Sequence, residues 1–484
     1  MSLFSEALSG YMTRSGDTVA ALAESAGYTH SHLFRIRQGE RPAREREKLE
    51  RLIDALRLSP SERIQLIELW TADRIGEDAY NRHMAVKAMI ESLNRHIDIM
   101  PPVPVSAAPV KGVYSGKENV RYMLHWILGS SCTVGRREIC IMAQPDDPMF
   151  SELLLAVCST VPSVPVTHII SLYPSGAEKR HQTDNLGCIQ NLLPCLLSNG
   201  EYRINYHYND IDALENHYLI MPNVFLMEDG VVLVSKNWDN AQISRETEVI
   251  SLYRRMFKEQ LRVTQPFNQP IPTLFHEVQY LMPMADAGIR RNPEECFYAI
   301  AQQPCITPYF KPDVAAYISD MYGNKEALID LFLNQYQPFL LKSKLVQFFC
   351  LSGVYDFLRV GVIWEMGDKS MSPLPKAHRI KMLKGLHEAG IAGKHRFYLI
   401  REDAFRLMPD AAMAIYQSGD FTVHIRNEED HICSVDESGI ANALRDFFEY
   451  LPDSRLVYSR EESLRMLMKV IQAAEEGALD SADK

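Results

Sequence analysis

Residues 17–41 constrain this chain more than any other stretch, because they read as two short helices joined by a tight turn. Each expected helix starts at a polar capping residue and stops at a glycine. In chain order these residues are Asp17 or Thr18, Gly27, Thr29 and Gly39. Leu33 and Ile36 give the second helix one apolar face, so its other positions are expected to face outward.

The spacing is that of a helix-turn-helix, in which the second helix enters the major groove of DNA. The outward and N-terminal positions of that helix are His30, Ser31, His32, Phe34, Arg35 and Gln38. Between residues 28 and 51 stand seven Arg or Lys and four Glu, although the whole chain has a net charge of -11. A local positive patch suits limited phosphate contact. The alternative is a small helical bundle with a solvated charged face.

Residues 4–70 resemble a Cro/C1-type (XRE family) helix-turn-helix domain of five helices. The stretch from Thr18 to Thr29 resembles the second helix and turn of that family, and Ser31 to Gly39 resembles its recognition helix and closing glycine. The resemblance implies base contacts from His30, Ser31, His32 and Arg35. Contacts with the DNA backbone are expected from Thr18, Thr29, Gln38, Arg41 and Arg44.

Two positions depart from the family pattern. Val19 stands where the family often has a Gln that anchors phosphate, so one backbone contact is lost. Arg37 stands where the family often has a Glu that braces the first helix, and we expect Arg37 to offer a backbone contact instead.

Length and composition favour an ordinary folded protein. A chain of 484 residues suggests about three domains, and 46% hydrophobic with 23% charged residues is typical of globular chains. No apolar run approaches the ~18 residues of a membrane helix, and the N-terminal residues lack the apolar core expected of a signal peptide. The lack of such a run predicts no membrane partner. The nine cysteines are scattered without a CxxC pair, which is typical of a cytoplasmic protein.

We expect a DNA-binding domain over 1–76, followed by a connecting helix and a Pro-rich linker over 77–110. In that helix Val86, Ile90, Leu93 and Ile97 form an apolar stripe, which either packs on the rest of the chain or joins two copies in a homodimer. Beyond the linker, helices alternate with short strands. We expect an α/β regulatory subdomain over 111–264 and a helical plus α/β regulatory or oligomerisation subdomain over 265–484.

The predicted fold class is therefore a five-helix all-α head followed by a mixed α/β (α+β) region. A second break is expected over 265–272. Ser115 and Glu118 form a capping box, which is expected to start a helix after residue 115. A further helix is expected over 341–358 and a strand over 404–407. A short sequence echo relates two stretches: Tyr218-Leu219-Ile220 is followed by Phe225, and Tyr398-Leu399-Ile400 is followed at the same offset by Phe405. The echo indicates either two related halves or a chance match.

Catalytic signatures are near-misses. Residues 112–118 have the wrong glycine spacing for a phosphate loop, and a capped helix start explains them better. Asp146 and Asp147 form either an acid pair or, more economically, a solvated turn. The scattered His and Cys residues lack zinc-site spacing. We therefore predict no catalytic residue, no metal and no cofactor.

The sequence predicts a cytoplasmic, sequence-specific DNA-binding transcriptional regulator with a large sensing or oligomerisation region. Its expected partners are double-stranded DNA and a second copy of the chain, and a small-molecule or peptide effector is left open. One alternative is an enzyme of unknown reaction in residues 111–484, fused to an autoregulatory DNA-binding head. The other is a head that binds proteins and never meets DNA.

Overall fold

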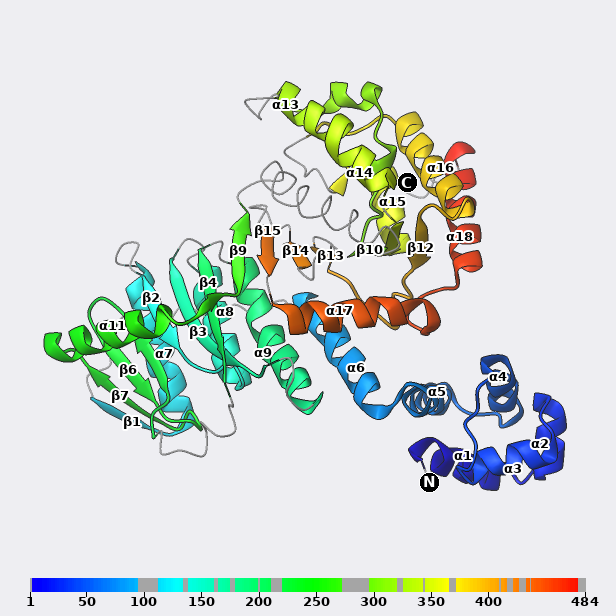
Figure 1. Cartoon of the computed structure of the whole chain (residues 1–484), viewed down its shortest axis with the longest axis horizontal. Coiled ribbons are helices and arrows are strands. Elements are labelled where there is room, and N and C mark those ends of the chain that lie inside the picture. Colours follow the sequence, from blue (N-terminus) through cyan, green and yellow to red (C-terminus); the bar gives the residue numbers. More distant parts are fainter. Residues whose placement is uncertain are drawn as a thin grey trace. The chain divides into compact units, whose positions relative to one another are not determined.

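The structure is a computed structural model, and it describes most of the chain. The described residues are 2–94, 112–133, 138–160, 164–174, 179–198, 201–209, 220–271, 296–319, 325–342, 344–364, 371–408, 411–415, 421–425, 432–435 and 437–477. Contacts divide the chain into two compact units, Met1–Ala85 and Val86–Lys484. The chain is a multidomain protein of mixed helix and sheet (Figure 1). The expected four-part division stays a prediction, and the Pro-rich linker lies outside the described residues.

The first unit is built from short helices around one apolar core. Its first five helices are α1 (Leu3–Ser15), α2 (Val19–Ala26), α3 (His30–Arg37), α4 (Arg46–Ala55) and α5 (Pro60–Ile75). Hydroxyl groups of Ser2, Thr18, Thr29 and Ser59 accept backbone N–H groups at helix starts. The core includes Phe4, Leu8, Leu22, Leu33, Leu52 and Trp70. Thr18 and Thr29, the two N-terminal capping residues expected from the sequence, therefore mark the starts of α2 and α3.

Helix α6 (Glu77–Glu91) continues into the second unit, where its apolar stripe is covered. Val86 and Met89 are fully buried there, and Ile90 is 2% exposed. The Ser92 hydroxyl in the following turn donates to the Gln190 carbonyl at 3.3 Å. Burial within the chain favours the interpretation that this stripe packs on the chain's own second unit. Ile97 lies outside the described residues.

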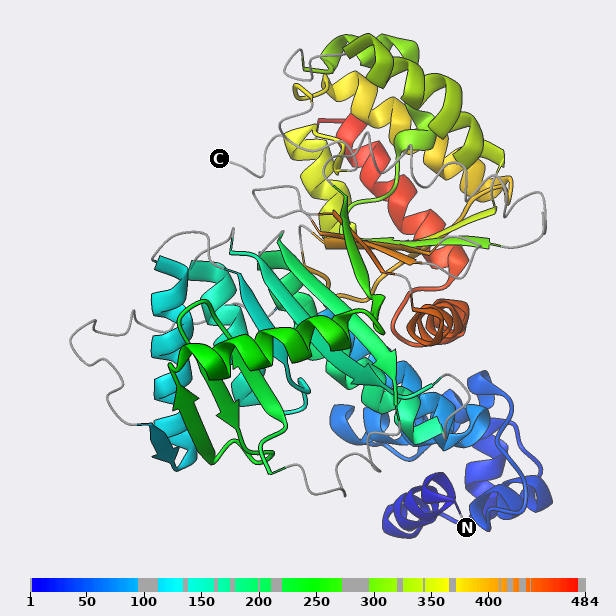
Figure 2. The same cartoon turned by 60° about the vertical axis from the view of Figure 1, so that its left-hand side comes forward.

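The first sheet of the second unit has eight strands in the order β1-β7-β6-β5-β2-β3-β4-β8. They are β1 (Val113–Ser115), β2 (Ile139–Met142), β3 (Val166–Leu172), β4 (Tyr202–Tyr208), β5 (Asn223–Leu226), β6 (Val231–Val234), β7 (Asn240–Ser244) and β8 (Gln265–Pro266). Helix α11 (Thr247–Leu261) packs Ile250 and Phe257 on one face (Figure 2). The other helices of this half are α7 (Lys117–Thr133), α8 (Pro148–Thr160) and α9 (Lys179–Ser198).

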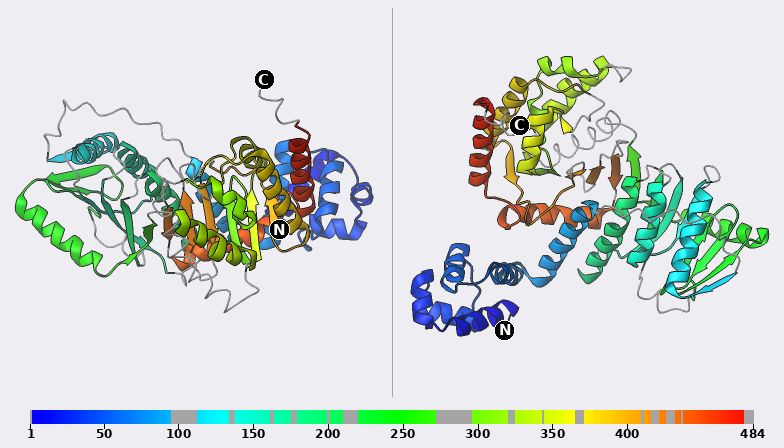
Figure 3. Two further views of the ribbon diagram at one scale, coloured as in Figure 1. Left: turned by 90° about the horizontal axis from the view of Figure 1, so that it is seen from above. Right: turned by 180° about the vertical axis from the view of Figure 1, so that it is seen from behind.

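The second sheet has seven strands in the order β12-β11-β10-β13-β14-β15-β9. They are β9 (Asn268–Ile271), β10 (Cys296–Ala301), β11 (Lys344–Phe349), β12 (Arg396–Leu399), β13 (Ala411–Ile415), β14 (Phe421–Ile425) and β15 (Ile432–Val435). Helices α15 (Leu351–Val360), α16 (Lys376–Ile391) and α18 (Arg460–Glu475) share one core with it. Helix α17 (Ser438–Tyr450) lies on the other side (Figures 1 and 3). Helices α13 (Lys325–Asp330) and α14 (Gln337–Lys342) lie between β10 and β11 in sequence.

The two sheets follow one plan. In each, three neighbouring strands are parallel (β2-β3-β4 and β10-β11-β12), and three antiparallel strands continue from the first of them. In each, a further strand closes the antiparallel edge, and one helix follows the last strand of the set. The echoed residues do not occupy matching places in this plan, because Phe225 lies in β5 whereas its counterpart Phe405 follows β12 outside any strand, and Tyr218 lies outside the described residues.

Four local predictions were wrong or incomplete. The helix expected over 341–358 is interrupted by β11, whose residues 345–349 are all buried between β10 and β12. An apolar run of that kind fits a buried strand as well as a helix. Ser115 ends β1, two residues before α7 begins at Lys117, and its hydroxyl donates to Asn240 Oδ1 at 2.9 Å. Residues 404–407 form no strand, because Ala404 ends a turn and residues 405–407 have no regular structure. Helix α9 was missed.

The expected break over 265–272 is in fact a connection between the sheets. Residues of β8 pair with β4, and residues of β9 pair with β15. The Asn268 side chain accepts the Ile204 N–H at 2.6 Å and donates to the Tyr202 carbonyl at 2.9 Å. Asn268 is 6% exposed. One short segment therefore hydrogen-bonds to both sheets, and we name residues 265–271 the strap.

A buried histidine joins the centre of the first sheet to the loop after β2. His168 on β3 is fully buried, with Nε2 2.8 Å from the Ala143 carbonyl and Nδ1 2.8 Å from the Tyr202 hydroxyl. A carbonyl only accepts, so Nε2 carries the proton and Nδ1 accepts from Tyr202. Burial lowers the pKa of His168 to about 4.

Replacing Asn268 tests the strap. Asn268→Ala leaves the buried Ile204 N–H and Tyr202 carbonyl without this partner, and we expect a loss of about 2 kcal/mol of unfolding free energy. The measurement is chemical denaturation of the full chain followed by circular dichroism. The control is Asn205→Ala, a half-buried asparagine on β4. Equal losses in both variants would contradict the bridging role.

His168 predicts a specific acid sensitivity. Its folded pKa lies below the ordinary value of 6.5, so unfolding takes up a proton as the pH falls from 6.5 toward 4. We expect this residue to remove about 2 kcal/mol of stability between pH 8 and pH 5. Denaturation midpoints of wild type and His168→Gln should diverge over that window, with exposed His30→Gln as control. Parallel pH profiles for wild type and His168→Gln would rule the effect out.

Candidate functional site

The outward face of α3 is set by what the helix buries. Leu33 is fully buried and Ile36 is 1% exposed, so both anchor α3 in the core of the first unit. The Thr29 hydroxyl accepts the His32 N–H at 3.2 Å and starts the helix. Gly27, in the turn before α3, has φ +75, a conformation that L side chains rarely adopt. The anchors and the turn fix which side chains point away from the core.

The four predicted base-contacting residues lie on that helix. His30, Ser31 and Arg35 are exposed, whereas His32 is half-buried. His32 meets Tyr28 edge-on with ring centroids 5.3 Å apart, and His30 stacks on Phe34 at 6.4 Å. Phe34 is 43% exposed. The structure thus places His30, Ser31 and Arg35 on the open surface of α3, while His32 also packs on its neighbour.

The predicted backbone-contacting residues fall into two groups. Gln38, Arg41 and Arg44 are exposed and follow α3 directly. Within the described part of the chain, Arg35, Arg41 and Arg44 make no ion pair, unlike Arg46 and Arg63, which pair with Glu50 and Asp54. Thr18 and Thr29 are exposed too, but their hydroxyl oxygens already accept helix N–H groups at 3.2 Å.

Arg37 serves the fold instead of the expected backbone contact. Its guanidinium donates to Ser9 Oγ at 3.0 Å and to Thr13 Oγ1 at 3.3 Å, and both acceptors belong to α1. The brace between α1 and α3 is therefore made by Arg37 and two hydroxyls. The family resemblance marks position 37 as a brace of the first helix. The expectation that Arg37 would instead contact the DNA backbone was wrong.

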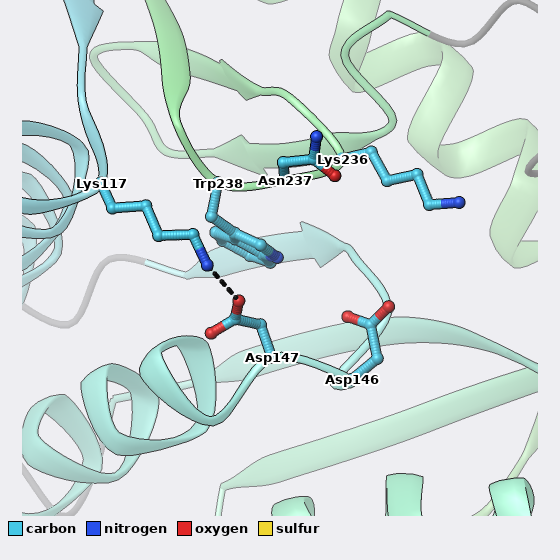
Figure 4. A pocket seen from close by; sticks show the side chains of 6 residues that line it. All are labelled: Lys117, Asp146, Asp147, Lys236, Asn237 and Trp238. Carbon is cyan, nitrogen blue, oxygen red and sulfur yellow. Dashed lines mark hydrogen bonds and ion pairs between the residues drawn. The ribbon is translucent and has the colours of Figure 1, made fainter.

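A second site lies in the first sheet of the second unit. An open cavity of about 450 Å³ is lined by Lys117, Asp146, Asp147, Lys236, Asn237 and Trp238 (Figure 4). Lys117 Nζ lies 3.2 Å from Asp147 Oδ2. Lys117 comes from the rejected phosphate loop, and the two aspartates form the turn that the sequence left as solvated. Residues 236–238 were missed, because no sequence pattern marks them.

The described ranges contain neither a cluster of metal-ligand side chains nor a helix that could cross a membrane. In those ranges, no group of three or more His, Cys, Asp or Glu side chains is placed to hold a metal ion. None of the helices in the described ranges has both the length and the apolar character needed to cross a membrane.

Comparison with known proteins gives few matches. No family model matches the sequence, and no curated protein matches it. Among solved structures, the chain matches phosphatidylserine synthase from Haemophilus influenzae Rd KW20. The match has 8% sequence identity and a TM-score of 0.22, and it covers 82% of this chain and 98% of the synthase chain.

This comparison corrects the functional prediction. The comparisons do not support the prediction of a sequence-specific DNA-binding transcriptional regulator: no family model and no curated protein matches, and the matching structure that we report is that of a synthase. A likeness of this size transfers neither fold nor activity. The chain therefore stands as a mixed α and β protein that resembles, weakly, a phosphatidylserine synthase.

Proposed function

We propose that residues 1–76 bind double-stranded DNA through α3. In this proposal α2 and α3 are the helix-turn-helix pair of a Cro/C1-type domain. The observation that carries it is the division of α3 into a buried face, Leu33 and Ile36, and an exposed face that bears His30 and Arg35. A helix that presents polar side chains beyond its own core fits the width of the major groove.

The charges next to α3 support the same partner. Arg35, Arg41 and Arg44 are exposed, and they form no ion pair within the described ranges. Cations without a carboxylate partner can neutralise phosphates without first breaking an ion pair. Gln38 adds an exposed amide at the end of α3. We therefore propose that this row of side chains follows the DNA backbone while α3 faces the base edges.

DNA binding by the first unit does not imply that the protein controls genes. Such binding would attach the second unit to a DNA duplex, whatever the function of the second unit. The homodimer, the cytoplasmic location and a small-molecule or peptide effector stay predictions. A protein-binding head remains the competing proposal, and its binding would depend little on salt.

Arg41→Ala tests the proposed backbone contact. We expect weaker binding to all duplexes alike, and a slope of log affinity against log salt that is smaller by about one, because one phosphate contact is lost. The measurement is fluorescence anisotropy of the full chain with labelled random-sequence duplexes across a salt series.

The matched control is Arg63→Ala, which removes an exposed arginine already paired with Asp54 at 2.7 Å. Its affinity and salt slope should equal those of wild type. Wild type that binds no duplex at low salt would overturn the DNA proposal. An equal effect of both variants would show that the contact is not specific to Arg41.

A further inference from the structure

The open cavity of about 450 Å³ lies where three separate segments of the chain meet. Lys117 begins α7, Asp146 and Asp147 lie between β2 and α8, and residues 236–238 form the turn between β6 and β7. These segments come together beyond the carboxyl end of β2 (Figure 4). Ligands of α/β sheets bind preferentially at this end of parallel strands, and the volume is that of a small-molecule site.

The loop between β2 and α8 is held by hydrogen bonds to its neighbours. The Gln144 side chain donates to the Ser171 carbonyl at 2.7 Å and accepts the Ser171 N–H at 3.1 Å. The Asn191 side chain donates to the Pro145 carbonyl at 2.7 Å. The loop therefore gives Asp147 a fixed position in the wall of the cavity.

The turn between β6 and β7 forms the opposite wall and is fixed as well. Ser235 Oγ donates to Asp239 at 2.7 Å and accepts the Asn240 N–H at 3.0 Å. The Gly116 N–H donates to the Asp239 carbonyl at 2.7 Å, which ties the start of α7 to this turn. Trp238 has φ +59, an unusual conformation for a bulky residue. Such outliers persist where the surrounding structure fixes them, and they gather at ligand sites.

Trp238 lines the cavity with a buried donor that lacks an acceptor. The residue is 1% exposed, and its Nε1 has no hydrogen-bond partner among the described residues. Figure 4 shows this nitrogen on the side of the ring toward Asp146 and Lys236. A buried N–H without a partner is costly, so a ligand in the cavity gains affinity if it supplies an acceptor there.

The charged side chains of the lining do not require a charged ligand. Lys117 Nζ already pairs with Asp147 Oδ2 at 3.2 Å. Asp146 and Lys236 also make interactions within the chain. A charged ligand would have to compete with groups of the protein for each of these side chains. Hydrogen bonding must therefore decide which ligand fits.

The hydrogen-bonding groups of the lining favour a ligand that both donates and accepts. Trp238 Nε1 only donates, whereas the Asp147 carboxylate only accepts. Lys117 and the Met149 N–H are the partners that the structure gives this carboxylate. A carboxylate has about four lone-pair positions, so Asp147 can accept a further hydrogen bond and keep both partners. The amide of Asn237, which is exposed, does both.

The lining offers little surface to a flat or apolar ligand. Of the described lining residues, only Trp238 has an aromatic side chain. Its ring stacks on Phe150 with centroids 4.7 Å apart and meets Phe225 edge-on at 6.1 Å. The ring is covered, so it leaves no face on which a nucleobase could stack. Hydroxyl groups suit this lining better, because each of them donates and accepts.

We propose that this cavity binds a neutral monosaccharide. One sugar hydroxyl accepts from Trp238 Nε1, a second donates to Asp147, and a third bonds to the Asn237 amide. The ion pairs of the lining stay as they are. The proposal is independent of DNA binding by the first unit, because it rests on residues of the second unit alone.

The test is isothermal titration of the full chain with glucose, galactose, mannose, ribose and xylose at millimolar concentration. We expect at least one sugar to bind, with an affinity that changes less than twofold between low and high salt, because no ion pair forms or breaks. Inorganic phosphate, spermidine and glycine serve as the anionic, cationic and zwitterionic probes, and adenine serves as the flat probe. Tighter binding of any probe than of every sugar would overturn the proposal, as would sugar binding that falls steeply with salt or no sugar binding at all.

Variants of two lining residues locate the binding. Trp238→Phe keeps an aromatic ring against Phe150 but removes the donor, and we expect it to weaken sugar binding at least tenfold, whereas Trp126→Phe on α7 leaves it unchanged. Asn237→Ala alters an exposed side chain, so this variant should fold even if Trp238→Phe does not. It should weaken binding at least fivefold, while Asn334→Ala, at an exposed asparagine between β10 and β11, has no effect. Wild-type affinity in Asn237→Ala would place the sugar elsewhere and overturn the proposal.

Discussion

The two sheets of the second unit depend on the hydrogen bonds that Asn268 makes to β4. Its backbone belongs to β9 and pairs with Val435, while its side chain satisfies one N–H and one carbonyl of β4. Phe267, fully buried beside it, donates its N–H to the Ile204 carbonyl at 2.8 Å. Edges of sheets are exposed to unwanted pairing unless something covers them. The strap covers an edge of each sheet with one continuous segment.

A second contact between the halves depends on a single carboxylate. Glu437 is 1% exposed and accepts the N–H groups of Gly439 and Ile440 at the start of α17. It also accepts the Tyr208 hydroxyl at 2.6 Å. Burial, and then this hydrogen bond, raise the pKa of Tyr208 above its ordinary range. The end of β4 and the start of α17 therefore share one acceptor.

Sequence patterns predicted the elements that a local signal governs. Hydroxyl caps located the starts of α2 and α3, and the spacing of Leu33 and Ile36 located the outward face of α3. The patterns failed where residues distant in the sequence determine the local structure. Residues 345–349 form a strand because β10 and β12 flank them, and Pro266 and Pro270 lie in the short strands β8 and β9 rather than in a linker. Arg37 faces α1 for the same reason, since Ser9 and Thr13 reach it only after folding.

The cavity shows why its residues escaped recognition. Lys117 and Asp147 were each dismissed on local grounds, and packing brings their side chains to 3.2 Å. Trp238 belongs to no motif at all. Yet the stacking of its indole on Phe150 gives this corner of the molecule an intrinsic optical label. Indole emission responds to charges and hydrogen bonds at the ring nitrogen, so an occupant of the cavity would change the emission spectrum of the unmodified protein.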